Sequence, residues 1–279
     1  MAAQSTDRDT QTATSDTAAI LSSRRSILKN AAIAGLAVTG AGLLTGKAAH
    51  AAATADDRPS FNPAPDHAIF TVARTAEQLA ITFYTNGVKN AATLGITGDN
   101  LVYLKAALIE EQIHQIFFRT HGGASLAATF SFPDPKTFTD LQTFIATQQT
   151  LEGAFDSAFL AAVKEFAQLG EPRHAQIAAQ IAMVESEHRV LGRVIAGLSP
   201  ADNWTYAPVL VHKVADAPGV LAAAGFLSPE KYPNNSYTYQ EVTFTDPAND
   251  PLGLSAIAAT IMYKDVPYTV SNDLIIQGD

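Results

Sequence analysis

Two short motifs in the 279-residue chain place a carboxylate and an imidazole at helical spacing. Glu111 and His114 form one motif, and Glu185 and His188 form the other. Residues three apart lie one turn apart on the same face of an α-helix. Carboxylate oxygens and imidazole nitrogens are ligands that suit iron or manganese. One such motif is common in helices, but two of them in one chain indicate a shared metal site.

Each motif has a partner carboxylate at a matching distance upstream. Glu77 lies 34 residues before Glu111, and Glu152 lies 33 residues before Glu185. In an antiparallel helical hairpin, residues at equal distances from the turn stand at the same level. Both midpoints fall beside a glycine, the residue that most often ends a helix. The spacing therefore predicts that the carboxylates of each pair stand level with each other.

All four carboxylates interrupt apolar stripes of helical period, which places them inside a helical bundle. A buried carboxylate is costly unless it is paired, and four together repel one another. No Lys or Arg occupies these stripes, whereas two divalent cations would neutralise the charge. The predicted metal ligands are Glu77, Glu111, His114, Glu152, Glu185 and His188.

Four segments with a 3.6-residue apolar period must position these ligands: residues 69–92, 100–119, 137–169 and 173–197. Gly95 and Gly170 mark short turns within two hairpins. Glycines at 122 and 123 and prolines at 133 and 135 mark a longer connection of about 17 residues. A short, a long and a short connection in this order are typical of the connectivity of a ferritin-like bundle rather than of a plain up-and-down bundle.

Over residues 67–198 the sequence resembles the ferritin-like di-iron carboxylate superfamily, in which two helices each supply a Glu and two others supply Glu-x-x-His. Within it, the chain is most similar to exported ferritin-like proteins related to desiccation-related proteins. The resemblance implies an all-α, ferritin-like four-helix bundle that binds two iron ions or, alternatively, two manganese ions. It also implies that Glu111 and Glu185 bridge the metals, while Glu77, His114, Glu152 and His188 are terminal ligands.

The flanking regions read differently from the bundle. Residues 1–51 resemble a twin-arginine signal peptide, with Arg24 and Arg25 before an apolar stretch and a small-x-small site ending at Ala51. That stretch is shorter than the ~20 residues of a membrane span, so we expect a periplasmic or secreted protein with no stable span after signal removal. Residues 52–66 are expected to be a linker.

Residues 199–279 are expected to form a mixed, irregular C-terminal extension. Residues 217–226 could form a short helix, and residues 237–245 alternate in a strand-like way. No catalytic motif is present there. This extension argues against a simple ferritin shell but leaves a homo-oligomer open.

Composition excludes several classes of function. The net charge of -9 argues against nucleic-acid binding, which needs a basic surface. The absence of cysteine excludes disulfides, thiolate nucleophiles and iron–sulfur clusters. A redox centre in this chain would therefore depend on an external electron donor for peroxide reduction.

These features favour a metal-dependent protein that oxidises ferrous iron or handles peroxide or oxygen. The alternative is a stress- or desiccation-related structural or interaction protein, in which the metal is structural or absent. The sequence does not choose between an enzyme and such a protein.

Residues near the motifs are expected to have lesser roles. Tyr84 and Gln149 could contact ligands, but core packing is the favoured interpretation. Glu110 and Glu187 are expected to be exposed, and His174 is expected to lie at the surface.

Overall fold

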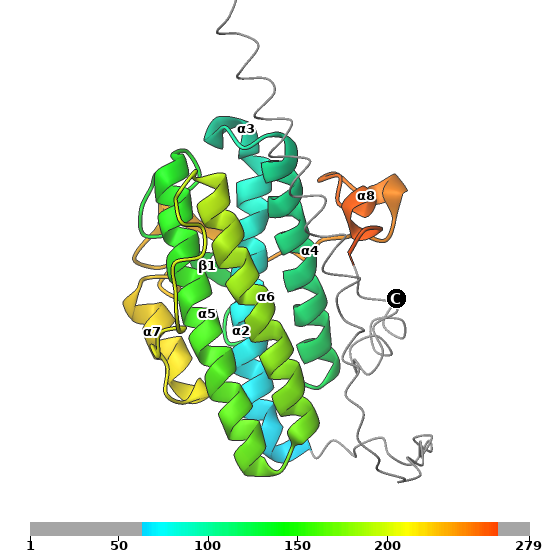
Figure 1. The fold of residues 1–279 in the computed structure, drawn as a ribbon, viewed down its shortest axis with the longest axis vertical. Helices are drawn as coiled ribbons and strands as arrows, with labels where there is room; N and C mark the ends of the chain where they lie inside the picture. The colour runs from blue at the N-terminus through cyan, green and yellow to red at the C-terminus, as the bar shows by residue number, and fades with distance from the viewer. Residues whose placement is uncertain (1–62, 262–279) are drawn as a thin grey trace, which may run out of the picture. The chain divides into compact units, whose positions relative to one another are not determined.

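The computed structural model describes residues 63–261, and the segment that resembles a twin-arginine signal peptide lies outside them. Four long helices dominate the described chain (Figure 1): α2 (Pro63–Lys89), α4 (Gly98–Thr120), α5 (Leu141–Leu169) and α6 (Pro172–Ile195). Helix α2 packs chiefly against α4, and α5 packs chiefly against α6. The predicted bundle of two antiparallel hairpins with a long crossover is confirmed.

Glycine and capping residues set the helix ends. Gly170 ends α5 with a left-handed φ of 79°, and Gly95 has a φ of 71° after the short helix α3 (Ala91–Leu94). Helix α5 begins at Leu141 rather than at residue 137, because Asp140 accepts a hydrogen bond from the Thr143 backbone N–H at 2.8 Å and so caps the helix there. Helix α2 begins at Pro63, inside the segment expected to be a linker.

The crossover and the C-terminal extension are joined by a two-stranded antiparallel sheet. Strand β1 (Thr129–Ser131) lies in the crossover and pairs with β2 (Ser236–Thr238), with Phe130 opposite Tyr237. The strand-like pattern over residues 237–245 therefore forms a strand only at its beginning. The Tyr239 N–H still bonds to the Ala128 carbonyl at 2.9 Å, but beyond it the described part of residues 237–245 forms no strand.

The rest of the described extension contains short helices between irregular segments, and one of them falls within residues 217–226 as expected. The turn η2 (Val214–Asp216) and helix α7 (Ala217–Ala223) pack against α5, whereas α8 (Ser255–Ala258) packs against α4 (Figure 1). Two further turns, η3 (Pro233–Asn235) and η4 (Pro247–Asn249), connect these parts.

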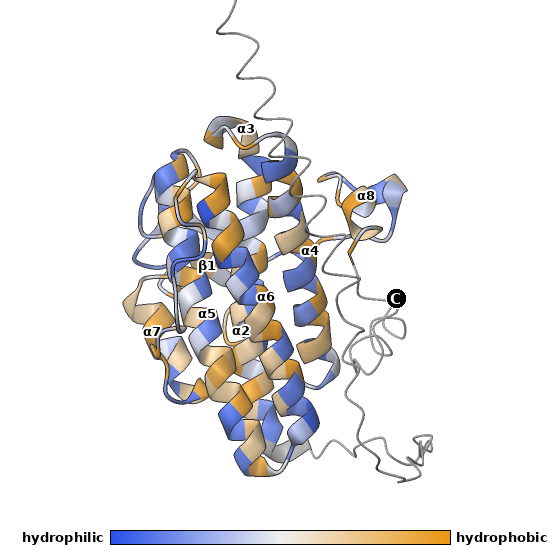
Figure 2. Cartoon of the chain, viewed as in Figure 1, coloured by the Kyte–Doolittle hydropathy of each residue, from blue (hydrophilic) through white to orange (hydrophobic). Residues whose placement is uncertain are grey.

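Aromatic packing fills the bundle on both sides of the level of Glu77. Phe83 and Phe144 stack with ring centroids 4.5 Å apart, and Phe70 meets Phe166 at 5.6 Å near the other end. Each long helix carries both apolar and polar residues (Figure 2), as expected when one face is buried. The polar level between two aromatic layers is therefore held in well-packed surroundings.

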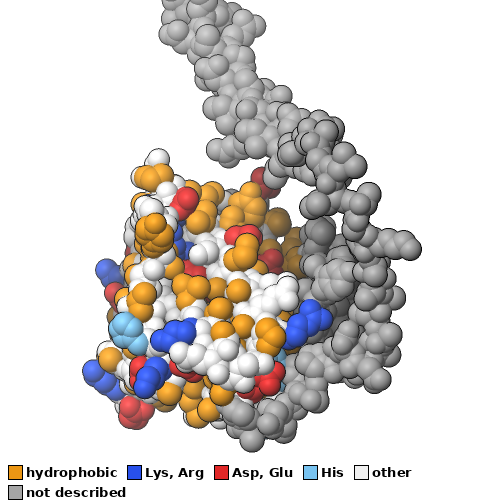
Figure 3. Space-filling view, turned by 60° about the horizontal axis from the view of Figure 1, so that its bottom comes forward, with side chains coloured by type: hydrophobic (Ala, Val, Ile, Leu, Met, Phe, Trp, Pro, Cys, Tyr) orange, Lys and Arg blue, Asp and Glu red, His pale blue; other side chains and the backbone are white. Residues whose placement is uncertain are grey.

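One face of the described chain carries apolar side chains between charged ones (Figure 3). Among residues 63–261, no helix is both long enough and apolar enough to cross a membrane.

Candidate metal centre

The structure brings all six predicted ligands together inside the bundle. Helix α2 supplies Glu77, α4 supplies Glu111 and His114, α5 supplies Glu152, and α6 supplies Glu185 and His188. All are buried except His114, whose side chain is 13% exposed. Four helices thus contribute ionisable side chains to one level, as the spacing predicts.

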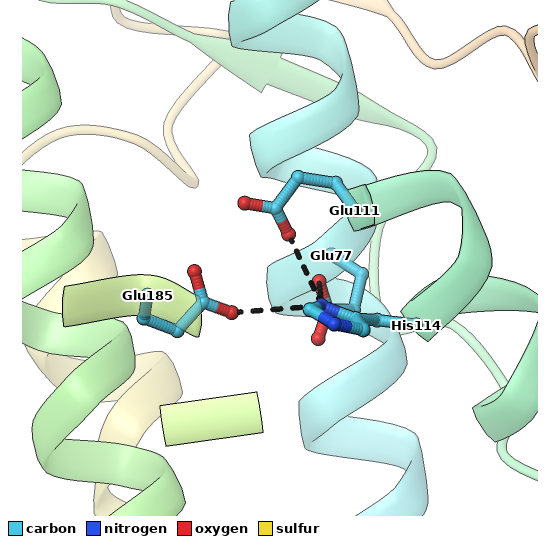
Figure 4. A group of neighbouring side chains, drawn as sticks. All are labelled: Glu77, Glu111, His114 and Glu185. Carbon is cyan, nitrogen blue, oxygen red and sulfur yellow. Dashed lines mark ion pairs between the residues drawn. The ribbon is translucent and has the colours of Figure 1, made fainter. Parts of the chain in front are cut away.

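The first of two groups is centred on His114 (Figure 4). Its Nδ1 lies 3.7 Å from Glu77 Oε2, 3.8 Å from Glu111 Oε2 and 3.8 Å from Glu185 Oε1. Ligand atoms around one ion at about 2.1 Å lie roughly 3.0–3.4 Å from one another. The distances between ligand atoms in the first group are therefore slightly longer than those expected around a bound ion.

The second group is centred on His188. Its Nδ1 lies 3.0 Å from Glu111 Oε1, 3.3 Å from Glu185 Oε2 and 4.0 Å from Glu152 Oε2. Glu111 and Glu185 therefore belong to both groups, and each presents one oxygen to His114 and the other to His188. That is the arrangement required of two carboxylates that bridge a pair of ions.

Burial and mutual repulsion shape the charge of these carboxyls. Burial, reinforced by Glu111, raises the pKa of Glu77 well above its usual value. Burial, reinforced by Glu185, raises the pKa of Glu152 in the same way, and burial with Glu111 raises the pKa of Glu185. Burial also acts to raise the pKa of Glu111, but contacts with Glu77 and the two histidines outweigh it and lower that pKa. Without metal, the group retains protons that ions would displace.

Several ligand atoms lack hydrogen bonds. Within residues 63–261, these buried atoms are Glu77 Oε1, both Glu111 oxygens, His114 Nδ1, Glu152 Oε2 and Glu185 Oε1. Buried polar atoms are rarely left without partners, and those that are need an explanation. Two divalent cations would satisfy these atoms, so the residues present fit a dinuclear centre.

Glu110 is a functional candidate that the sequence argument assigned to the surface. Its side chain is only 29% exposed, and its Oε2 lies 2.8 Å from His188 Nε2. This contact, with those to Glu111 and Glu185, raises the pKa of His188 despite the opposing effect of burial. Glu110 therefore orients the imidazole and leaves Nδ1 directed at the other carboxylates. Glu187 is exposed, as expected.

Tyr84 contacts the site rather than only packing in the core. Its hydroxyl donates a hydrogen bond to Glu152 Oε1 and accepts one from Gln148 Nε2 at 3.1 Å. Gln148 also donates to the His188 carbonyl at 2.7 Å, whereas Gln149 bonds to the Arg189 carbonyl at 2.8 Å. The buried glutamine beside the ligands is therefore Gln148, which the sequence argument missed in favour of its neighbour.

Asp156 is a second carboxyl that the sequence argument missed. It is buried one turn after Glu152 and accepts a hydrogen bond from the Ser186 hydroxyl at 3.2 Å. Burial, reinforced by the charge of Glu185, raises the pKa of Asp156 to about 7. The helical spacing of Glu152 and Asp156 was the available signal.

Substitution Gly192→Ala is expected to disturb this level of the bundle. A Cβ at Gly192 would overlap Gln148 Oε1, so Gln148 would lose its bonds to Tyr84 and His188. Overpacking of this kind lowers the free energy of unfolding by about 1–3 kcal/mol. Each kcal/mol lowers Tm by about 2–4 °C in a protein of this size. Thermal unfolding measures the loss. Gly219→Ala in α7, where a Cβ has no neighbour within 4 Å, should not lower Tm, because alanine favours the helix more than glycine does.

Substitution Glu110→Gln is expected to weaken metal binding about 10- to 100-fold, because an amide orients the His188 imidazole less strongly than a carboxylate does. Competition with a chelator of known affinity measures the change. The matched control is Glu187→Gln on the exposed side of α6, which should retain the affinity of the unaltered chain. Equal affinities for all three chains would contradict an orienting role for Glu110.

Comparison with known proteins accounts for the bundle. The family model described as the ferritin-like domain matches residues 65–197, a range that contains all six predicted ligands. These residues form a ferritin-like domain. Comparisons with curated proteins and with solved structures found no match. The ferritin-like domain explains the four long helices, while the relation to desiccation-related proteins stays a prediction.

Proposed function

We propose that the ferritin-like domain holds a dinuclear iron or manganese centre, with which an exported protein oxidises ferrous iron or handles peroxide or oxygen. One observation carries the proposal: Glu111 and Glu185 each direct one carboxylate oxygen to each histidine-centred group. Two ions that share carboxylates can each exchange one electron with a small substrate.

The residues of the chain would hold and tune the ions. Glu77 and His114 would hold one ion and Glu152 and His188 the other, with Glu111 and Glu185 between them. Tyr84 would fix Glu152 through its hydrogen bond. Burial and the charge of Glu185 raise the pKa of Asp156 to about 7 in the metal-free chain, so Asp156 would hold or release a proton beside the site near neutral pH.

Helix α4 offers the side from which small reactants would reach the centre. His114 is 13% exposed and Glu110, on the same helix, is 29% exposed, whereas the other ligands have at most 1% exposure. Small reactants need a path to a buried centre, whereas a purely structural ion needs none. The partial exposure on α4 therefore favours a reactive centre over the alternative of a structural metal.

Metal analysis and turnover of the purified chain test this function together. The chain, loaded with Fe²⁺ under anaerobic conditions or with Mn²⁺, is expected to contain two ions and to oxidise added Fe²⁺ with oxygen or peroxide, or to consume peroxide. The variant with Glu111→Ala and Glu185→Ala sets the background rate. Two tightly bound ions with turnover no faster than that background would favour the structural alternative and reject the redox function.

Export is the second part of the proposal and rests on the paired Arg24 and Arg25 before an apolar stretch. Fractionation of the source cells should find the chain outside the cytoplasm. Replacing both arginines with lysine should retain it inside. Export of the lysine variant at the original level would reject the twin-arginine route.

A further inference from the structure

A third group of ionisable side chains lies where α2 and α6 begin, at the end of the bundle that carries the α5–α6 turn. Asp66 stands in the first turn of α2, Glu171 precedes α6, and His174 lies in its first turn. Figure 1 shows the beginning of α2 and the α5–α6 turn at the same end of the bundle. His174 Nδ1 lies 2.8 Å from Asp66 Oδ2 and 3.9 Å from Glu171 Oε2.

This group is separate from the dinuclear centre. His174 and Glu185 are both on α6, eleven residues apart, which corresponds to about 16 Å along the helix. Phe70 and Phe166 pack against the His174 ring, each with ring centroids 5.1 Å away. An apolar layer therefore divides the two sets of ligands.

Two of the three side chains are buried, and Glu171 is 21% exposed, so the group is not a chance surface cluster. Asp66 and His174 are each only 1% exposed, so the expectation of a surface position for His174 is wrong. The hydrophobic residues around His174 in α6 account for this, because its ring lies on the inward face of the helix. Within the described chain, neither Asp66 oxygen makes a hydrogen bond of normal geometry, although Oδ2 is close to the imidazole.

A buried carboxylate without hydrogen bonds needs a compensating charge. The imidazole supplies little of it, because burial lowers the pKa of His174 to about 4 and keeps the ring neutral near pH 7. A neutral imidazole beside two carboxylates is instead the state in which these groups bind a metal ion.

We propose that Asp66, Glu171 and His174 bind one divalent ion of the zinc class. The three ligand atoms lie within 4.8 Å of one another, and the distances of 2.8 and 3.9 Å from His174 Nδ1 bracket the roughly 3.4 Å expected for a tetrahedral site. One imidazole and two carboxylates form a donor set that zinc accepts. The ion would tie the beginning of the first bundle helix to the beginning of the last.

Zinc titration of a chain that lacks the dinuclear centre tests the site. In the variant with Glu111→Ala and Glu185→Ala, the full chain should bind one Zn²⁺, and the ion should raise its Tm. Adding Asp66→Asn, which preserves size and leaves the packed His174 ring intact, should weaken Zn²⁺ binding at least tenfold. The matched control is Asp99→Asn, an exposed aspartate in the first turn of α4, which should retain binding.

The single substitution Asp66→Asn in the otherwise unaltered chain provides a second test that does not depend on the alanine variant folding. Saturated with Zn²⁺, it should contain one ion fewer than the unaltered chain, and Glu171→Gln should lower the affinity of the same ion. The proposal is overturned if the alanine variant folds and binds no Zn²⁺. It is equally overturned if Asp66→Asn leaves both the zinc content and the affinity unchanged.

Discussion

Replacing Glu111 and Glu185 together with alanine is expected to remove both ions of the dinuclear centre. Each carboxylate gives one oxygen to the His114 group and one to the His188 group, so their loss deprives both ions of two ligands at once. Elemental analysis should show a fall from two iron or manganese ions per chain to nearly none. Because removing two of the four buried carboxyls also relieves their mutual repulsion, the variant should remain folded.

Single substitutions refine this expectation. Glu77 belongs only to the first group, so Glu77→Ala should weaken binding of one ion more than of the other. Glu152 belongs only to the second group, so Glu152→Ala should have the same effect on the other ion. Glu165→Ala, near the α5–α6 turn, is a control outside both groups and should retain two ions. If the double variant still held both ions, the assignment of Glu111 and Glu185 as bridging ligands would be wrong.

The metal-free protein is expected to lose stability as pH rises from about 5 to 8. Folding raises the pKa of Glu77, Glu152 and Glu185 above the ordinary 4.5 and the pKa of His188 above 6.5. The folded chain then binds more protons than the unfolded chain, so stability falls with increasing pH. Glu111, whose pKa is lowered, acts in the opposite direction, but only below about pH 4.5. Burial lowers the pKa of His121 and His174, so these two histidines make the fall shallower below about pH 6.5.

Each extra proton held by the folded state corresponds to about 1.4 kcal/mol per pH unit, or roughly 3–6 °C in Tm. Thermal unfolding of the chelator-treated chain at several pH values measures the slope. Metal should stabilise the chain more at high pH, because ions replace the protons of their ligands. With Glu77→Gln and Glu152→Gln, which cannot titrate, the slope should be shallower. A Tm that rises between pH 5 and 8 without metal would contradict the account of the site.

The long-range features of this fold were accessible from the sequence because they depend on periodicity and turns. The apolar period locates four helices, and equal distances from the glycine turns bring Glu77 level with Glu111 and Glu152 level with Glu185. Neither feature depends on the shape of any side chain, and together they predict all six residues that the structure brings together.

Local contacts were less accessible because they depend on side-chain reach. Glu110 lies beside a motif on a neighbouring face, yet its flexible side chain extends to His188 Nε2. Gln148 and Gln149 are adjacent in sequence, so their positions alone do not show which one contacts the metal ligands. Gln148 is distinguished by its packing against Gly192 and its hydrogen bond to Tyr84. His174 looked like a residue of a helix end, but the first turn of α2 covers it with Asp66. The short strand at residues 236–238 likewise depends on a partner in the distant crossover.

Anomalous diffraction from crystals of the iron- or manganese-loaded chain tests the central claim most directly. The account predicts two peaks inside the bundle, one among Glu77, His114 and the paired Glu111 and Glu185, the other among those two glutamates, Glu152 and His188. A single peak, or none at this level in a fully loaded crystal, would contradict it.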